Sequence, residues 1–506
     1  MSQKQTTDTH RRFVYLIVLC LLLFSVVLRA ALTFNRELDM DEFQHLHSAW
    51  MVGHDYLIYR DFWEPHTPLL YYLLLPLFHF FREGAGLVLA ARVLMSLTAF
   101  GILLLTYALA RLGHDRLTSL LAVLVLSFMV IFVQKSIEIR PDQPLVIMWL
   151  ASLWVAARAL AEGRGLKWFF SAGLLLGVGF LFSPKALIPL GAMGLTLLAL
   201  VLGGQRRPLQ GFLSLRSFLA FLKVGCAYAF GFLLPVVACF ALFYRAGDLK
   251  EMFEYTLFEN FTFPHTYHPT YLLYLRNVCF FLLAFAGIFL RARDFKGLSR
   301  AARTTHLALL LPALLLLFVI LFLVAYPFPQ IVLLCAPLFA VYAAEAVRRS
   351  LDYALKTRRS PDGTRPERLT PGFKGALSLA AALAAALVIP CVMLLLKERP
   401  FTKTNAWQFQ RMEYVLSRTR PTDAVFDGEE AYVFRPQAFF YGALVQGIEW
   451  RIGQGQIKDD IPQSLSDTGC KVVIYDERVA ALPESDQLFI KTHYAPSTEP
   501  DVYLAR

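Results

Sequence analysis

The stretch RRFVYLIVLCLLLFSVVLRAAL, residues 11–32, decides the class of this protein. A helix needs about 20 mainly apolar residues to cross the roughly 30 Å hydrocarbon core of a bilayer, and this stretch meets that length. Its basic flank is like that of a signal peptide. The apolar run, however, exceeds the usual central region of such a peptide and lacks a convincing small-x-small cleavage site. We therefore predict that it is retained as a first transmembrane span.

The same length rule, applied to the whole chain, predicts a polytopic α-helical membrane protein. The 506 residues are 57% hydrophobic, with a mean hydropathy of +0.51. About eleven candidate spans follow from the rule. They cover residues 13–33, 86–110, 117–134, 144–161, 168–183, 186–203, 219–243, 271–290, 306–325, 329–347 and 375–396. The apolar piece at 68–81 has only about 14 residues, the length of an interfacial or re-entrant segment.

The distribution of charge predicts the orientation of the chain. The net charge of +11 does not indicate nucleic-acid binding, because Lys and Arg stand in short clusters between apolar runs. If residues 68–81 do not cross, clusters such as GGQRRPLQ (203–210) and RARDFKGLSRAAR (291–303) fall on one side. By the positive-inside rule that side is cytoplasmic, together with the N-terminus. The first loop, residues 34–85, which we expect to contain juxtamembrane helices, and the chain after Lys397 are then external.

The composition changes to that of a soluble domain near residue 397. The runs DAVFDG (423–428) and KVVIYD (471–476) are typical of strands, and DIPQSLSDTG (460–469) has a polar helical pattern. We predict a transmembrane domain at 1–396 and a small external α/β domain at 397–506. The seven cysteines show no metal-ligand spacing, so neither a disulfide framework nor a structural zinc is expected.

Four polar segments fall on the external side in this topology. They are LDMDEFQHLHSAW (38–50), DFWEPHTPLL (61–70), EIRPDQP (138–144) and FSPKAL (182–187). Their ionisable residues are Asp39, Asp41, Glu42, His45, His47, Asp61, Glu64, His66, Glu138, Arg140, Asp142 and Lys185. A charged side chain in the middle of a membrane helix costs about 2.5 to 3.5 kcal/mol on insertion scales, so such residues indicate function by default.

Each segment also has a purely structural interpretation. Asp39 or Asp41 would make a good N-cap for a helix beginning DEFQHLHSAW. Glu138 and Asp142 could anchor the chain at the interface beside prolines, and a single lysine such as Lys185 often reaches toward water from an apolar surface. The presence of all four segments on one face favours a shared site.

Carboxylates and cations at the surface of a lipid-embedded bundle suit one chemistry in particular. A carboxylate can accept the proton of an acceptor hydroxyl, and adjacent carboxylates such as Asp39 and Glu42 would strengthen it as a base. Nearby cations would neutralise a phosphate that gathers charge as it leaves. Such a leaving group needs no general acid. These groups together indicate sugar transfer from a lipid phosphate.

The order of these motifs resembles the membrane glycosyltransferases of fold class C. The motifs are D-x-D-E (39–42), E-P-H-T-P-L (64–69), R-P-D-Q-P (140–144), S-P-K (183–185) and Y-P-F-P-Q (326–330), within residues 10–345. The similarity is greatest to the bacterial branch with the lipid A aminoarabinose transferase and the rhizobial lipopolysaccharide-core transferases. Protein O-mannosyltransferases are more distant.

The resemblance implies roles for individual residues. Asp41 matches the catalytic base, Glu42 its acidic neighbour, and Asp142 the acid of the second loop that positions substrate. Lys185 matches a lysine near the lipid phosphate. Because of their charges, we expect Arg140 and His66 to stabilise the departing phosphate together with Lys185.

Two departures from the family pattern leave roles open. Thr67 separates His66 from Pro68, so either His66 or Glu64 is the phosphate-side group. Gln330 stands where relatives often carry a histidine and a tyrosine, which puts a role for that turn in doubt.

The resemblance further implies a polyprenyl-phosphate sugar donor and an inverting displacement in a bacterial inner membrane. The acceptor would be a glycan, a lipid or a protein, and membrane lipids would surround the spans. No Gly-rich loop for a nucleotide follows a strand. The loop at 244–270, with His265, Tyr267 and His268, has the length of a cover over the donor, and a solvated loop is the alternative. No cofactor is required by the sequence, and a divalent metal stays an open alternative.

Two other classes of function compete with this interpretation. A secondary transporter or flippase of lipid-linked sugars would also place polar groups along a substrate path. Such proteins usually show paired halves and broken helices near the midplane, whereas no half of this sequence repeats the other. A scaffold whose external domain binds a partner is the third possibility, and the carboxylate cluster makes it less attractive.

Overall fold

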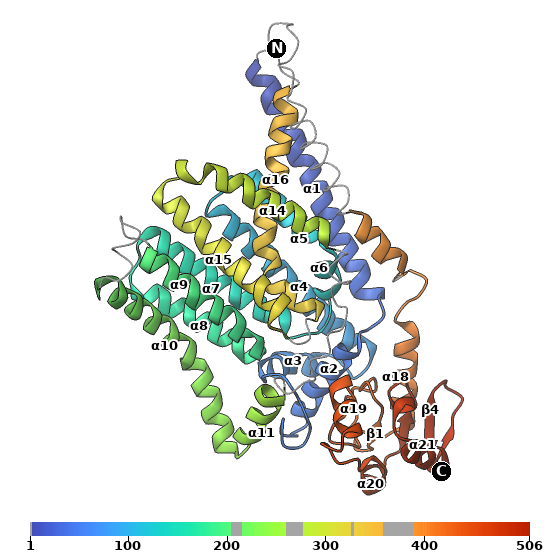
Figure 1. The fold of residues 1–506 in the computed structure, drawn as a ribbon. Helices are drawn as coiled ribbons and strands as arrows, with labels where there is room; N and C mark the ends of the chain where they lie inside the picture. Colours follow the sequence, from blue (N-terminus) through green and yellow to red (C-terminus); the bar gives the residue numbers. More distant parts are fainter. Residues whose placement is uncertain are drawn as a thin grey trace.

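A long apolar helix leads into a bundle of helices, and a small α/β unit follows at the C-terminal end (Figure 1). The structure is a computed structural model that describes residues 3–203, 215–259, 277–324, 328–357, 388–397, 399 and 401–506. The helices before the C-terminal unit are α1 (Gln3–Asn35), α2 (Met40–Gly53), α3 (Leu69–Phe80), α4 (Ala85–Arg111), α5 (Arg116–Ser127), α6 (Val130–Lys135), α7 (Asp142–Glu162), α8 (Leu166–Phe182), η1 (Pro184–Ala186), α9 (Leu187–Gly203), α10 (Leu215–Ala246), α11 (Leu249–Phe253), η2 (Glu254–Phe258), α14 (Val278–Asp294), η3 (Phe295–Gly297), α15 (Arg300–Phe322), η4 (Pro329–Leu334) and α16 (Ala336–Thr357).

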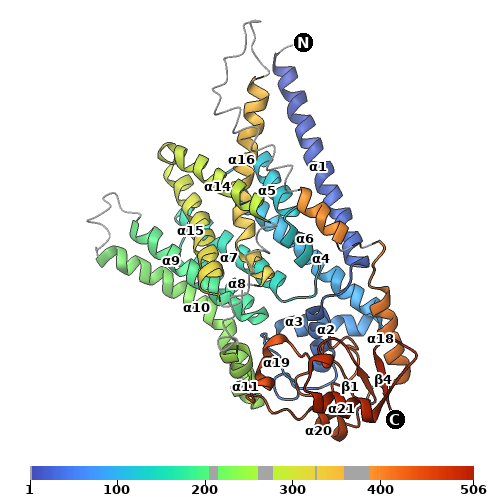
Figure 2. The ribbon, with the colours of Figure 1, turned by 45° about the vertical axis from the view of Figure 1, so that its right-hand side comes forward.

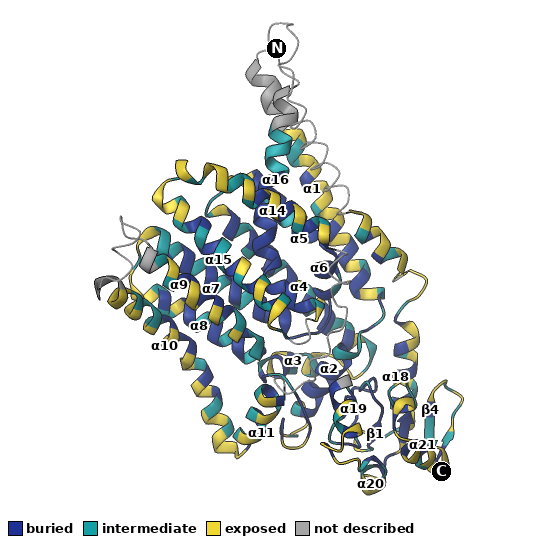
Figure 3. Cartoon of the chain, viewed as in Figure 1, coloured by how far each residue is buried: buried dark blue, intermediate teal, exposed yellow. Residues whose placement is uncertain are grey.

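The prediction of a polytopic helical membrane protein is confirmed. Within the described residues, five helices are long and apolar enough to cross a membrane, judged by length and composition: α1, α4, α7, α10 and α15. Shorter apolar helices lie at Leu69–Phe80, Arg116–Ser127, Leu166–Phe182, Pro184–Leu200 and Val388–Lys397. Of the most apolar 18-residue stretch of each helix, 61% is buried in α7 but only 22% in α1. Helix α7 is therefore central and α1 peripheral (Figure 3).

Two predicted spans are broken in the structure. The span at 117–134 is divided into α5 and α6, because Met129 has an extended backbone with ψ of 122°. Lys135, the last residue of α6, lies next to the segment 138–144 and contacts Glu138. The span at 329–347 begins with the 3₁₀ helix η4, and α16 starts only at Ala336. The predicted short segment at 68–81 is α3, whose 12 residues span about 18 Å, too little for a bilayer core.

Small residues let α8 and α10 approach closely, as is usual where helices pack inside a membrane. A Cβ atom added at Gly173 would lie 1.9 Å from the carbonyl oxygen of Tyr228, and one at Gly231 would lie 2.1 Å from that of Phe170. Both contacts are to backbone, so no side-chain rotation relieves them.

The replacement Gly173→Ala should therefore destabilise the bundle although alanine is the better helix former. We expect a loss of about 1 to 3 kcal/mol, the usual cost of overpacking, seen as a lower melting temperature of the detergent-solubilised protein. Gly191→Ala in α9 is the matched control, because nothing lies within 4 Å of a Cβ there. Equal melting temperatures for the two variants would contradict the close packing.

The C-terminal unit contains the α/β elements that the sequence predicts. Its sheet has the order β1-β2-β4-β3, with β1 (Val425–Phe426) parallel to β2 (Val472–Ile474). Strand β4 (Val502–Ala505) runs antiparallel to β2 and to β3 (Tyr494–Pro496). The helices are α18 (Ala406–Arg418), α19 (Gln446–Gly453), α20 (Ile461–Asp467) and α21 (Glu484–His493), with the 3₁₀ turn η5 (Val479–Ala481). The predicted strands are β1 and β2, and the predicted helix is α20.

Helices α2 and α3 lie between the bundle and the C-terminal unit in both ribbon views (Figures 1 and 2). Several hydrogen bonds join the unit to the first loop. His47 Nδ1 lies 2.7 Å from the carbonyl oxygen of Val433, and the Trp63 N–H donates to the carbonyl of Phe440. The 397–506 unit therefore packs directly on the loop that carries the first two polar segments. The exact domain boundary stays a prediction.

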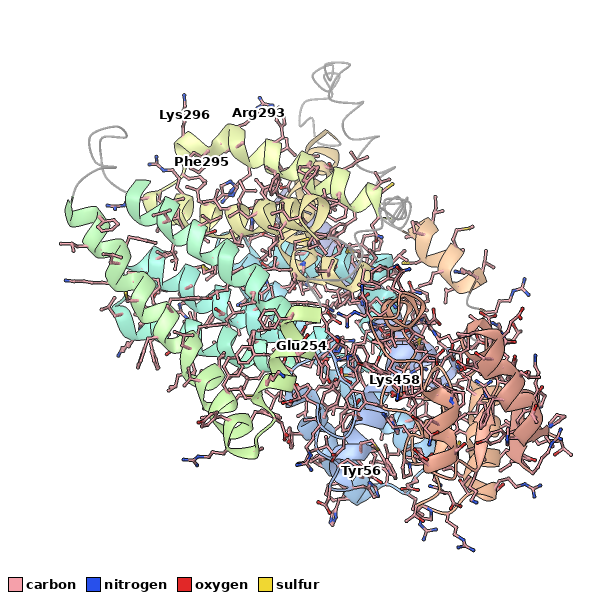
Figure 4. All side chains as sticks on the ribbon, turned by 60° about the horizontal axis from the view of Figure 1, so that its bottom comes forward. Tyr56, Glu254, Arg293, Phe295, Lys296 and Lys458 are labelled. Atoms are coloured by element: carbon pink, nitrogen blue, oxygen red, sulfur yellow. The ribbon has the colours of Figure 1, made fainter. Side chains whose placement is uncertain are left out.

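The two ends of the molecule carry different loops. Figure 4 shows Arg293 and Lys296 at one end and Tyr56 of the first loop at the other. The basic loop at 291–303 and the polar first loop are thus on opposite sides. Which of them faces the cytoplasm stays a prediction.

Candidate active site

The acidic start of α2 is shaped by its own N-cap. Asp39 caps the helix: its carboxylate accepts a hydrogen bond from the N–H of Asp41 at 3.3 Å, and its own N–H donates to Glu42 Oε1 at 2.9 Å. This arrangement is a capping box. The N-cap interpretation is therefore right for Asp39. The side chain of Asp41 takes no part in the cap and is 33% exposed.

Arg140 brings the two acidic loops together. Its guanidinium donates to Asp39 Oδ1 at 2.6 Å, to Asp41 Oδ2, and to Glu138 Oε2 at 2.5 Å. Burial alone would lower the pKa of Arg140, but Asp41, Asp39 and Glu138 raise it well above its usual value. The cation is thus fixed between residues about 100 positions apart in sequence.

Glu138 is the buried centre of this network. It is fully buried and accepts hydrogen bonds from Lys135 Nζ at 2.9 Å and from Arg36 Nη1 at 3.0 Å, besides that from Arg140. Burial would raise the pKa of Glu138, but Lys135 and Arg140 lower it. Sequence reasoning missed Lys135 and Arg36. The spacing of Lys135 three residues before Glu138, on the same segment, was the available signal.

Glu42 is held by Arg92, which the sequence analysis did not select. Both side chains are fully buried, and Arg92 donates from Nε and Nη2 to the two carboxylate oxygens at 2.8 and 2.6 Å. Arg92 also donates to the carbonyls of Arg36 and Glu37 at 2.6 and 2.9 Å. This pair clamps the start of α2 to α4. A lone charge inside a predicted span, 86–110, was the signal for Arg92.

Asp142 and Lys185 form a second ion pair beside Arg140. Lys185 Nζ lies 2.8 Å from Asp142 Oδ1. Asp142 begins α7, and Lys185 lies in the turn η1 between α8 and α9, as the sequence predicts. The lysine side chain is 23% exposed, so its ammonium retains donors for a ligand.

Glu64 and His66 lie beside these pairs. Glu64 is fully buried; its Oε1 accepts from the N–H of His66 at 3.1 Å, and Oε2 accepts from Ser48 Oγ at 2.8 Å. His66 Nδ1 is 2.9 Å from Glu64 Oε1. The charge of His66 interacts with Asp142, which places this segment next to the Lys185 pair.

The remaining predicted residues lie elsewhere. Asp61 is exposed and accepts a hydrogen bond from the N–H of Leu57 at 2.7 Å, so it closes its own turn. Gln330 is buried in η4. The predicted donor cover at 244–270 is described only as far as residue 259, where it contains α11 and η2. Its residues His265, Tyr267 and His268 lie outside the described part of the chain.

The carboxylates of the cluster do not present an open site for a hard divalent cation. Such an ion needs several free carboxylate or carbonyl oxygens. Four carboxylates are instead balanced by four cations: Asp39, Asp41, Glu138 and Asp142 against Arg36, Lys135, Arg140 and Lys185. The second oxygen of Asp41 accepts no hydrogen bond from any residue in the described part of the chain. This oxygen has room to accept a further hydrogen bond.

Comparisons with known proteins agree on one architecture. Residues 65–243 match the family model for dolichyl-phosphate-mannose-protein mannosyltransferases. No curated protein matches the sequence. The structure of ArnT from Cupriavidus metallidurans in the apo state aligns with a TM-score of 0.55 at 14% identity, over 92% of this chain and 94% of that one.

Two further solved structures contain a lipid phosphate. ArnT from Cupriavidus metallidurans bound to undecaprenyl phosphate aligns with a TM-score of 0.53 at 15% identity, over 83% of this chain and 85% of that one. The oligosaccharyltransferase AglB from Archaeoglobus fulgidus, in complex with an inhibitory peptide and a dolichol-phosphate, aligns with a TM-score of 0.54 at 15% identity, over 97% and 74%. At these identities the likeness establishes a common fold. Residues 65–243 are therefore similar to the family of dolichyl-phosphate-mannose-protein mannosyltransferases, and the chain shares the fold of ArnT and AglB.

Proposed function

We propose that the protein transfers a sugar from a polyprenyl-phosphate donor to an acceptor hydroxyl, with Asp41 as the general base. One observation carries this proposal: the partly exposed carboxylate of Asp41 and the partly exposed ammonium of Lys185 both bind side chains of the segment 140–142. Asp41 is bound to Arg140, and Lys185 is bound to Asp142. The Cα atoms of Arg140 and Asp142, two positions apart, lie within about 7 Å of each other. The charges of these two residues interact, so the two ion pairs are neighbours.

The proposed reaction is a single displacement at the anomeric carbon. The acceptor oxygen forms a bond to that carbon while the bond from carbon to the phosphate oxygen breaks. The phosphate leaves with the bonding electron pair, and the free oxygen of Asp41 takes the hydroxyl proton. Attack opposite the leaving group inverts the configuration at the anomeric carbon.

The neighbouring residues divide the other tasks. Lys185, and His66 beside it, stabilise the charge that gathers on the departing phosphate. Arg140 holds Asp41 and Asp39 in place and is a positioning residue. Asp142 orients Lys185, and Glu64 orients His66. Glu42, predicted as a catalytic neighbour, has its carboxylate committed to Arg92, so its role is to position α2.

The donor class is supported by two kinds of evidence. The structural relatives contain undecaprenyl phosphate and dolichol-phosphate, which share one chemistry: a long prenyl chain and a phosphate. The polar site of this chain lies at one end of an apolar bundle, where the phosphate would meet Lys185 and the prenyl chain the spans. We place the site at the periplasmic face of a bacterial inner membrane, with a glycan, lipid or protein as acceptor.

A lipid-sugar transporter is the second candidate, and the geometry favours it less. Transporter sites usually lie at the midplane between repeated halves. Here the charged network borders the first loop and the C-terminal unit, away from the centre of the spans (Figure 1). The charged side chains of this network are also paired with one another rather than arranged along a path for a substrate.

Replacing Lys185 tests the donor side of the proposal. We expect Lys185→Gln to raise the KM for the donor by roughly 10- to 100-fold, because a hydrogen bond to a charged group contributes about 1.5 to 3 kcal/mol. The assay supplies the full-length protein in lipid nanodiscs with a panel of synthetic polyprenyl-phosphate sugars, and measures release of the polyprenyl phosphate in the presence of acceptor extracts.

Lys167→Gln is the matched control, since Lys167 is an exposed residue at the opposite end of α8. An unchanged donor KM in the Lys185 variant would remove that residue from the phosphate site. Failure of the wild type to release phosphate from any donor, together with donor movement across vesicles, would support the transporter instead.

A further inference from the structure

Three residues at the phosphate side of the proposed active site form a compact polar group, and the transfer chemistry gives no role to one of them, His45. His45, Glu64 and His66 each offer a ligand atom, and these atoms all lie within 4.8 Å of one another. His45 and Glu64 are buried, and the His66 side chain is 20% exposed. The two imidazole rings meet edge to face with centroids 4.8 Å apart. Two imidazoles and a carboxylate at such distances match the ligand set of divalent zinc.

The surrounding residues fix these side chains in place. Ser48, one turn after His45 on α2, donates from Oγ to Glu64 Oε2 at 2.8 Å. Tyr71 OH on α3 lies 3.3 Å from His45 Nδ1. Such outer partners orient ligands and set which imidazole nitrogen remains open. The ligands therefore come from two separate segments whose positions α2 and α3 determine.

A buried carboxylate from the C-terminal unit faces this group. Glu430 is 3% exposed, and its Oε2 has no hydrogen-bond partner among the described residues. Its charge interacts with that of Glu64 and with Tyr71. Gly442 makes room for it, because a Cβ there would lie 2.2 Å from Glu430 Oε1. Two buried carboxylates that face one another are costly unless a cation lies near both.

We propose that His45, Glu64 and His66 bind one divalent transition-metal ion of the zinc class, with the Glu430 carboxylate as its neighbour from the C-terminal unit. Nitrogen ligands favour such an ion over magnesium or calcium, which prefer oxygen. The ion replaces the proton that His66 Nδ1 shares with Glu64. It neutralises the facing carboxylates and ties the C-terminal unit to the first loop. The site shares Glu64 and His66 with the phosphate side of the proposed active site, and metal binding can be measured without sugar transfer.

Metal content of the purified full-length protein tests this proposal. After treatment with a chelator and reloading with Zn²⁺ or Co²⁺, the wild type should bind one ion per chain and His66→Asn should bind none. In the Co²⁺ form, the position and intensity of the visible d–d absorption bands report the coordination geometry of the bound ion. The melting temperature of the wild type should rise with Zn²⁺, and that of His66→Asn should not. His54→Asn, a half-exposed histidine at the end of α2, is the matched control and should retain the ion.

A second variant tests the contribution of the C-terminal unit without touching a ligand. Glu430→Gln should weaken Zn²⁺ affinity roughly 10-fold or more, as loss of an outer partner does. Glu429→Gln, its neighbour on the same loop, should not. Failure of the wild type to take up Zn²⁺ or Co²⁺ would overturn the proposal. Full stoichiometry in His66→Asn, with wild-type affinity in Glu430→Gln, would overturn it as well. None of these readouts needs sugar transfer, so the two proposals fail separately.

Discussion

Asp41→Asn is expected to lower kcat for sugar transfer by about 10²- to 10⁴-fold, with little change in the donor KM. The amide oxygen of asparagine can still accept the hydrogen bond from Arg140, so the start of α2 keeps its geometry. The amide cannot accept the proton of the acceptor hydroxyl. Only the reacting state loses stabilisation, which is why the effect falls on kcat. Turnover of a polyprenyl-phosphate sugar with saturating donor measures it.

Asp61→Asn provides the control for this prediction. Asp61 belongs to the same first loop but is exposed and closes only its own turn. Its variant should turn over as the wild type does. Wild-type turnover in Asp41→Asn would exclude this carboxylate as the base, and the single displacement written above would need another proton acceptor.

The second large effect concerns folding rather than chemistry. Arg92→Met should destabilise the protein by about 3 to 5 kcal/mol, because it leaves the fully buried Glu42 carboxylate without its partner. The carbonyls of Arg36 and Glu37 lose a donor at the same time. Most of the protein should then fail to reach a monodisperse state in detergent. The yield on size exclusion and the melting temperature of the remainder measure the loss.

A double variant separates the buried charge from the lost packing. Arg92→Met combined with Glu42→Gln removes both charges and should recover part of the stability, since a neutral amide is cheaper to bury than an unpaired carboxylate. Arg158→Met removes an exposed ion pair with Glu162 and should cost at most about 1 kcal/mol. If the double variant were as unstable as the single one, the charge of Glu42 would not be the cause.

The stability of the acidic network and its reactivity are separate properties of neighbouring residues. Glu138 and Glu42 are fully buried and satisfied by several donors each. Asp41 shares Arg140 with Glu138, and its second oxygen accepts no hydrogen bond in the described part of the chain. Burial of the neighbouring charges in pairs would fix the position of the carboxylate that we propose as the base, which is a form of preorganisation.

The sequence by itself determined the architecture of the protein. Apolar runs of about 20 residues specify membrane helices because unpaired backbone polar groups cannot be placed in lipid. The shift in composition near residue 397 indicated a second unit, and two of its four strands and the helix at 461–467 were predicted correctly. The order of the acidic motifs also indicated the fold that the chain shares with ArnT and AglB. These signals are local, so a single sequence contains them in full.

Only the tertiary structure decided which charges are partners. Arg92 pairs with Glu42, and Lys135 pairs with Asp39 and Glu138. Only the contact between Lys135 and Glu138, three residues apart, follows from spacing in the sequence. The other two contacts join segments that no spacing rule connects. The same holds for His45, Glu64, His66 and Glu430, which show no metal-ligand pattern along the chain. Coulomb interactions and hydrogen bonds depend on distance in space. That distance is set by how α2, α4, α6 and the C-terminal unit pack, and packing is a property of the whole chain.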